Sequence, residues 1–117
     1  GCPTNAKQSM LVTTIPAALD LGARLLTETR AQDFELEQGR IVALNCVAVT
    51  PNGEPRPERR LRIVAKHYVV AGGAINSPAL LLRSRLPDPH GLLGRRTFLH
   101  PVVISAAVFD HAVEGWN

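Results

Sequence analysis

AGGAINSPALLLRS (residues 71–84) carries the strongest architectural signal in this sequence. It begins within the apolar run YVVAGG (68–73) and passes through Ser77 and Pro78 into the leucine-rich stretch PALLLRS (78–84). A continuous apolar run is typical of a strand covered on both faces, as in the interior of a parallel sheet. Serine as N-cap with proline at the first helical position is a good helix start. The spacing therefore predicts a strand over 68–73 followed by a helix over 78–84.

The two glycines between these elements allow two interpretations. Gly72 and Gly73 form either a tight strand-to-helix connection or a place where the backbone comes close to a ligand, because glycine has no Cβ. In open α/β sheets, ligands bind at the carboxyl ends of the strands, and a helix N-terminus there favours an anion. The stretch contains neither GxGxxG nor GxxxxGK[ST], so the residues alone favour the tight turn.

N-terminal to this unit, the apolar spacing predicts a helix over 9–22 that ends at Gly22. Pro16 fits only a first helical turn, so either Thr14 caps a short helix or a longer helix kinks at the proline. The next segment, ARLLTETR (23–30), reads as a strand. This helix-to-strand step is typical of an α/β fold.

The middle of the chain predicts a three-stranded antiparallel meander. DFELEQ (33–38) alternates, a Gln-Gly-Arg turn follows, and IVALNCVAV (41–49) is the return strand. TPNGEPRPE (50–58) reads as an exposed loop because of its prolines and Asn-Gly, and RRLRIVAKH (59–67) alternates again. PVVISAAVF (101–109) is expected to form a last strand.

Composition excludes several classes of function. The 117 residues are 45% apolar with a net charge of +3, and no apolar run approaches the ~18 residues of a membrane-spanning helix. The arginines of RPERRLR (56–62) are interrupted by glutamate and lack neighbouring aromatic side chains, so a solvated loop is favoured over a phosphate-binding patch, and no nucleic-acid partner is expected. Because the opening GCPTNAKQSM lacks an initiator Met, we expect a piece of a longer protein.

No catalytic or metal-binding residue is predicted from the residues themselves. Cys2 and Cys46 are too far apart for a CxxC pattern and read as a loop thiol and a small strand hydrophobe. The four histidines show neither i, i+4 pairing nor HExxH. His100 has no carboxylate partner in the sequence and is expected to have a packing or strand-entry role, and no serine lies in GxSxG.

Two stretches together resemble the glucose–methanol–choline (GMC) oxidoreductases, flavoenzymes that oxidise alcohols with FAD. The family's second signature runs roughly Gly-Ala-x-x-Ser-Pro-x-Leu-Leu-x-x-Ser-Gly, and Arg85 stands at its final glycine. GLLGRRTFLHP (91–101) is similar to the family's VGR(N)xxxHP segment, with Arg96 in place of the usual Asn. The opening thirty residues also resemble bacterial, choline dehydrogenase-like members. The residues that match the second signature are Gly73, Ala74, Ser77, Pro78, Leu80, Leu81 and Ser84.

This resemblance implies an α/β fold (α+β as a fragment) that is part of an FAD/NAD(P)-binding Rossmann-like domain with a three-stranded antiparallel meander. Residues 1–95 would be a partial FAD-binding domain, and 96–117 the start of the substrate-binding domain. The backbone of Ala31 would meet the adenine, and Ala71 and Gly72 would border the adenosine part of FAD. Ser77 would cap the helix behind them. The residues implied to bind the cofactor are Ala31, Ala71, Gly72, Ala74 and Ser77.

The resemblance also implies that other functional segments of the family lie outside this sequence. The family's GxGxxG lies N-terminal and its catalytic histidine far C-terminal, so FAD and a small alcohol are expected partners of the full-length parent. The isolated chain is expected to bind FAD poorly and to be inactive. Deprived of neighbouring strands, it is expected to self-associate through exposed strand edges. The alternative is a small non-catalytic α/β interaction or ligand-sensing module.

Overall fold

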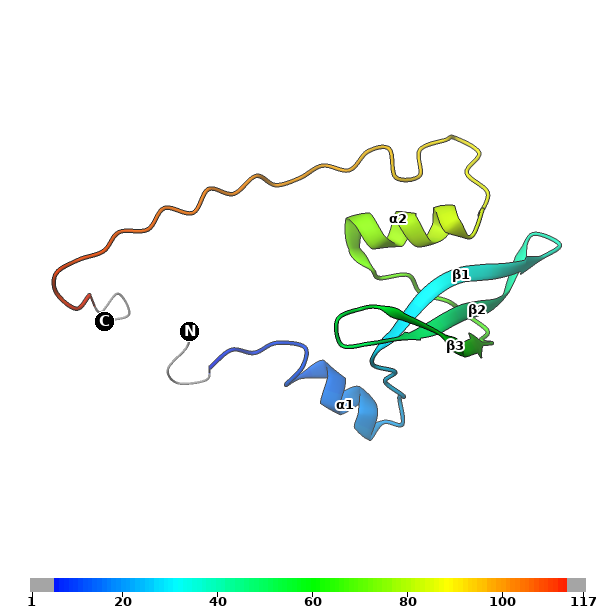
Figure 1. Cartoon of the computed structure of the whole chain (residues 1–117), viewed down its shortest axis with the longest axis horizontal. Coiled ribbons are helices and arrows are strands. Elements are labelled where there is room, and N and C mark those ends of the chain that lie inside the picture. Colours follow the sequence, from blue (N-terminus) through cyan, green and yellow to red (C-terminus); the bar gives the residue numbers. More distant parts are fainter. Residues whose placement is uncertain (1–5, 114–117) are drawn as a thin grey trace.

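Two helices and one antiparallel sheet make up the regular structure of the computed structural model, which describes residues 6–113 (Figure 1). The three strands are neighbours in chain order, β1-β2-β3, as predicted for a meander. The fold class is therefore an α/β fragment, as expected. The elements are α1 (Thr14–Asp20), β1 (Thr29–Glu37), β2 (Arg40–Val49), β3 (Pro55–Ile63) and α2 (Gly73–Arg83).

The meander is confirmed, but its first and third strands each begin four residues earlier than predicted. β3 starts at Pro55 and not at residue 59, so the connecting loop shortens from the predicted 50–58 to 50–54. The register moves from Val47↔Arg60 to Ala48↔Arg56, so three residues of β3, including Pro57, lie unpaired in a bulge. Proline is tolerated at an edge or a bulge of a sheet because no ladder hydrogen bond is needed from it there. Two of the three prolines that suggested a loop, Pro55 and Pro57, therefore lie in an edge strand, and Pro51 lies in the turn before it.

The β1–β2 hairpin contains two one-residue irregularities that offset each other. Gln32 is skipped in the register of β1, between residues 31 and 33, and Val42 is skipped in β2, between residues 41 and 43. Each strand thus carries one extra residue, so the pairing register near the turn is the same as the register before the two irregularities. Gln38 and Gly39 form that turn with φ of 48° and 77°, the left-handed geometry of a tight two-residue hairpin.

The core lies along β1 and β2, where α2 packs against β1. Cys46 on β2 is 4% exposed, and burial raises the pKa of its thiol, with a further contribution from the negative charge of Asp33. The thiol stays neutral and serves as the predicted small hydrophobe, while Cys2 lies outside the described residues. The buried apolar residues are Phe34, Ala43, Cys46, Val47 and Leu80.

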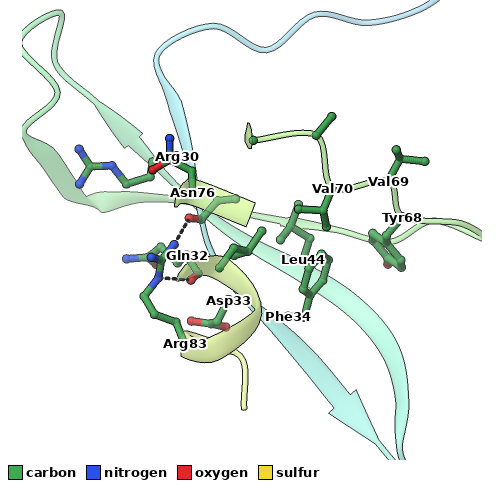
Figure 2. Close-up of a pocket in the computed structure, with 14 residues that line it drawn as sticks. Arg30, Gln32, Asp33, Phe34, Leu44, Tyr68, Val69, Val70, Asn76 and Arg83 are labelled. Carbon is green, nitrogen blue, oxygen red and sulfur yellow. Dashed lines mark hydrogen bonds between the residues drawn. The ribbon is translucent and has the colours of Figure 1, made fainter. Parts of the chain in front are cut away.

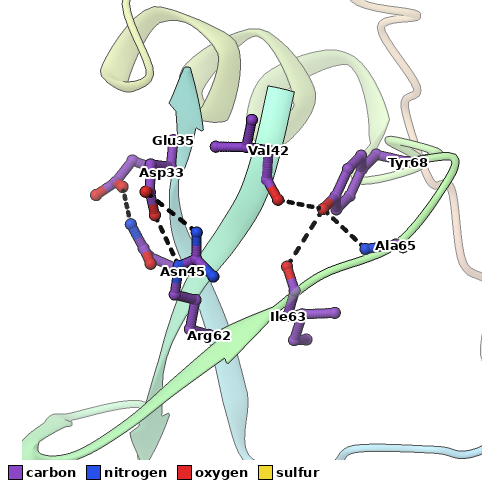
Figure 3. Close-up of polar contacts among 8 residues, drawn as sticks. All are labelled: Asp33, Glu35, Val42, Asn45, Arg62, Ile63, Ala65 and Tyr68. Carbon is purple, nitrogen blue, oxygen red and sulfur yellow. Dashed lines mark hydrogen bonds and ion pairs between the residues drawn. The ribbon is translucent and has the colours of Figure 1, made fainter. Parts of the chain in front are cut away.

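The side chain of Tyr68 hydrogen-bonds the connection between β3 and α2 to the sheet (Figure 3). Its hydroxyl accepts a hydrogen bond from the backbone N–H of Ala65 at 3.0 Å. The same hydroxyl lies 3.3 Å from the carbonyl oxygens of Val42 and Ile63 and donates its proton to one of them. The ring meets Phe34 edge-on, with centroids 5.5 Å apart. One side chain thus joins β1, β2 and the end of β3.

Changing Tyr68 to Phe is expected to lower the free energy of unfolding by about 1 kcal/mol, because the ring contact remains but the Ala65 N–H and one carbonyl lose their partner. Thermal or urea unfolding of the complete polypeptide encoded by the reading frame measures the difference. Tyr68→Leu, which also removes the ring contact with Phe34, should have a lower free energy of unfolding than Tyr68→Phe. Equal stability of Tyr68→Phe and the wild type would contradict this role for the hydroxyl.

Three predicted strands are wrong for the described residues. The segment 23–30 is regular only from Thr29, residues 68–71 have no ladder pairing and 72–73 already form the start of α2, and 101–109 is exposed without ladder pairing. Leu25, Val69 and Val103 are 55%, 89% and 90% exposed, although their apolar character favours burial. A strand needs a neighbour for its backbone hydrogen bonds, and the described residues place none beside these segments. His100, expected to lead into the last strand, is likewise exposed.

Both helices differ from their predicted bounds. The 9–22 prediction reduces to the seven residues of α1, with Pro16 in the first turn and Gly22, at φ 90°, just beyond its end. The short helix is thus the correct alternative, but Thr13 and not Thr14 is its N-cap, without a side-chain hydrogen bond.

The helix predicted over 78–84 begins one turn earlier, at Gly73. Gly72 is its N-cap, so Ser77 is not the cap and Pro78 lies inside the helix. The prediction failed because it assigned the glycines to the preceding strand, whereas the backbone already turns there. After the helix, Arg85 adopts φ 52°, in the left-handed region that favours glycine.

The described chain is far from compact. Its Cα radius of gyration is 20.2 Å, whereas a compact chain of this length would have about 13 Å. α1 and the segment after residue 95 extend away from the sheet and α2 (Figure 1). Within the described residues, no helix is long and apolar enough to cross a membrane. Exposed apolar segments and the free edge of β3 remain available for pairing, and self-association stays a prediction.

Candidate functional site

A cavity of about 1080 Å³ lies between β1, one face of α2 and the connection that leads into the helix (Figure 2). One part of its wall is apolar and formed by the sheet, the connection and the helix. The polar part comes from β1 and from α2. The apolar side chains are Phe34, Leu44, Tyr68, Val69, Val70 and Leu80, and the polar ones are Arg30, Gln32, Asp33, Asn76 and Arg83.

The cavity brings together three of the five residues expected to bind a cofactor. Ala31 from β1 lies in the same cavity wall as Ala71 and Gly72 from the opening of the quoted motif. These residues are forty positions apart in the sequence. Ala74 and Ser77 are not part of the wall: Ala74 is exposed and Ser77 is half-buried in the second turn of α2.

The adjacent glycines of the motif are required for different reasons. Gly73 has φ 78°, which glycine adopts without strain, and a Cβ there would meet open space. Gly72 has φ −81°, which any residue adopts, but its Cβ would lie 3.2 Å from the Cβ of Asn76 and 3.4 Å from the backbone nitrogen of Ser77. Gly72 is therefore needed for close packing at the cavity wall, and Gly73 for the turn into the helix.

Sequence reasoning missed the face that α2 presents to the cavity. Asn76, Leu80 and Arg83 all line it, and they follow each other at i, i+4 and i+7. That spacing was readable once the helix was begun at Gly73. It was missed because starting the helix at residue 78 left Asn76 outside it.

Charged groups of the sheet are arranged in short-range pairs (Figure 3). Asn45 donates a hydrogen bond from Nδ2 to Oδ1 of Asp33 at 2.9 Å, which holds this cavity-lining carboxylate. Arg62 on β3 makes two hydrogen bonds to Glu35 on β1, at 2.8 and 3.1 Å. This bidentate contact lowers the pKa of the Glu35 carboxyl and raises that of the Arg62 guanidinium. The Glu35–Arg62 pair spans the sheet outside the cavity.

The cavity has the character of a binding surface, and its one carboxylate, Asp33, is held by the hydrogen bond from Asn45. Its wall contains no histidine, cysteine or serine. Among residues 6–113, no group of three or more His, Cys, Asp or Glu could hold a metal ion. Apolar side chains beside exposed backbone suit a flat ring that hydrogen-bonds to main-chain atoms.

Comparison with known proteins indicates which kind of ligand the cavity could bind. The family model described as GMC oxidoreductase, for the N-terminal region of such enzymes, matches residues 1–102. The chain belongs to the GMC oxidoreductase family. The matched range contains every residue of the cavity wall and the whole AGGAINSPALLLRS stretch, which confirms the resemblance of the motifs.

Relatives of this GMC chain are considerably longer. It is 36% identical to an uncharacterised GMC-type oxidoreductase of Sinorhizobium fredii, over 97% of the chain and 21% of the relative. It is 35% identical to an uncharacterised GMC-type oxidoreductase of Mycobacterium tuberculosis, over 100% and 17%. A long-chain-alcohol oxidase of Arabidopsis thaliana is 28% identical, over 93% and 15%. The chain spans about a fifth of the length of these two uncharacterised relatives, and no solved structure matches it significantly.

Proposed function

We propose that this GMC chain supplies the adenosine-side wall of an FAD site in an enzyme that oxidises the CH–OH group of an alcohol. Residues 1–95 would form part of the FAD-binding domain, and 96–117 would begin the substrate-binding domain. The observation that carries the proposal is that Ala31, Ala71 and Gly72 share one cavity wall although β1 and the motif are distant in sequence.

The residues of the cavity fit an adenosine group. Val69, Val70 and Leu80 offer apolar contact to a purine ring. The lack of a Cβ lets Gly72 pack closely against Asn76 and Ser77 of α2, and Gly72 forms part of the cavity wall. We propose Ala31, Ala71 and Gly72 as backbone contacts, while Ser77 supports Gly72 from behind and Ala74 forms the first turn of α2.

The chain's own part in the reaction would be to bind and orient. When bound, FAD supplies the hydride acceptor for alcohol oxidation. The residues of β1, the motif and α2 would hold its adenosine end and exclude water from it. Because these residues would hold the adenosine end of FAD and not its reacting end, we expect the isolated chain to be inactive.

The substrate would be a small alcohol handled by segments outside this sequence. Family membership favours this enzyme over the alternative of a non-catalytic module, because the GMC match covers residues 1–102. The name of the Arabidopsis relative supports an alcohol as substrate class. Whether the acceptor of the electrons is oxygen, as in an oxidase, or another molecule, as in a choline dehydrogenase-like enzyme, is decided by measurement.

The complete polypeptide encoded by the reading frame is expected to purify yellow, with a flavin absorption band, and to reduce that flavin when a substrate alcohol is added. A panel of primary and secondary alcohols, assayed with oxygen and with an artificial acceptor, identifies substrate and acceptor class. The 1–117 chain serves as the control and should neither retain FAD nor turn over. A complete polypeptide that is colourless and binds no added FAD would overturn the proposal.

A further inference from the structure

The C-terminal turn of α2 is hydrogen-bonded to β1 at the irregularity around Gln32 (Figure 2). Nε of Arg83 donates a hydrogen bond to the carbonyl oxygen of Gln32 at 3.0 Å, and Nη2 donates to that of Ala31 at 3.4 Å. Gln32 is the residue skipped in the β1–β2 register. A bulge re-aims the backbone of its strand, and one guanidinium holds two successive carbonyls at this bulge.

Ser84, the C-cap of α2 next to Arg83, hydrogen-bonds to another residue of the same segment of β1. Its hydroxyl donates to the carbonyl oxygen of Leu80 at 2.7 Å and accepts the backbone N–H of Phe34 at 2.8 Å. Ser84 and Phe34 are both buried, at 7% and 5% exposure. Three backbone groups of residues 31–34 are therefore fixed by two consecutive side chains of α2.

These contacts act on the cavity wall and not on a remote part of the fold. Ala31 faces the cavity beside Asn76, Leu80 and Arg83, which form one face of α2. A carbonyl oxygen has two lone pairs, so the bond from Arg83 leaves the Ala31 oxygen able to accept a second donor. The planar guanidinium presents several donors in a fixed fork, which the single ammonium of lysine cannot reproduce.

We propose that Arg83 is a positioning residue, whose guanidinium holds the bulge of β1 so that the backbone of Ala31 faces the cavity in the orientation required by the adenosine end of FAD. This inference rests on the proposed function. Ser84 supports the same geometry by keeping residues 33–34 against the helix. Neither residue needs to touch the ligand for this role.

The test measures binding of FAD and of ADP to the apo form of the complete polypeptide carrying Arg83→Ala or Arg83→Lys. Loss of two charge-assisted bonds that orient the site is expected to weaken both ligands by about tenfold. Lysine should not restore affinity, whereas added guanidinium ion should partly restore it in the alanine variant. The reduction potential of bound flavin should not change, because only the adenosine end is affected.

Arg40→Ala is the matched control, since Arg40 is exposed and makes no side-chain hydrogen bond within the described residues. It should leave both affinities unchanged. Circular dichroism checks folding, and if the alanine variant does not fold, the lysine variant decides. Wild-type affinity for both ligands in the Arg83 variants would overturn the positioning role alone. A wild-type polypeptide that binds neither ligand would overturn the proposed function and this inference with it.

Discussion

Replacing Phe34 with alanine is expected to lower the free energy of unfolding by about 3–5 kcal/mol, as is usual for a phenylalanine removed from a core. Phe34 is 5% exposed, meets the ring of Tyr68 edge-on and forms part of the cavity wall. Its backbone N–H is also the group that Ser84 holds. The substitution would leave a void at the point where β1, α2 and the Tyr68 connection meet.

Thermal unfolding of the complete polypeptide, with and without FAD, measures this loss. Phe34→Leu is the control, because an apolar side chain of related size is expected to cost less than about 1.5 kcal/mol. Since a domain is stabilised by only ~5–15 kcal/mol, the alanine variant should also lose soluble yield. If Phe34→Ala lowered the free energy of unfolding no more than Phe34→Leu does, the side chains around the phenyl ring would not be well packed.

Replacing Gly72 with valine is expected to weaken FAD binding by about 10- to 100-fold. The backbone conformation tolerates valine, but its Cβ would lie 3.2 Å from that of Asn76, at the cavity wall. Overpacking of this kind costs about 1–3 kcal/mol, which corresponds to that range of dissociation constants when the displaced groups form the site. FAD titration of the apo polypeptide, followed by quenching of flavin fluorescence, measures the effect.

Gly39→Ala is the matched control for Gly72→Val. Gly39 has φ 77° in the hairpin turn, away from the cavity, and a Cβ there meets nothing within 4 Å. The strain of a left-handed residue should lower stability by about 1–2 kcal/mol but leave FAD affinity unchanged. If Gly72→Val bound FAD like the wild type, the backbone at Gly72 would have no place in the site.

The meander could be predicted from sequence because its signals are local. Alternation in 33–38, a Gln-Gly-Arg turn and the return strand over 41–49 specify a hairpin without reference to other elements, and the structure contains it. The strand over 68–73 was predicted from the same kind of pattern, but a strand covered on both faces needs neighbours. The described residues provide none, so residues 68–71 have no ladder pairing and Val69 is exposed.

The candidate site was predictable only in part. The family resemblance indicated Ala31, Ala71 and Gly72, which the fold gathers in one cavity wall. The hydrogen bonds of Arg83 could not be predicted from motif or spacing, because they depend on a bulge at Gln32 that no residue pattern indicates. Ser77 was expected at a helix start, but the positive φ of Gly73 lets the helix begin one turn before it.

The two irregularities of the β1–β2 hairpin each contact a side chain from a distant segment. Between Gln32 and Val42 the two strands are shifted by one residue relative to uninterrupted pairing. The carbonyl of Gln32 is held by Arg83, and that of Val42 lies within hydrogen-bonding distance of Tyr68. The alignment of this hairpin is therefore stabilised by side chains twenty-six and fifty-one positions downstream as well as by its own turn.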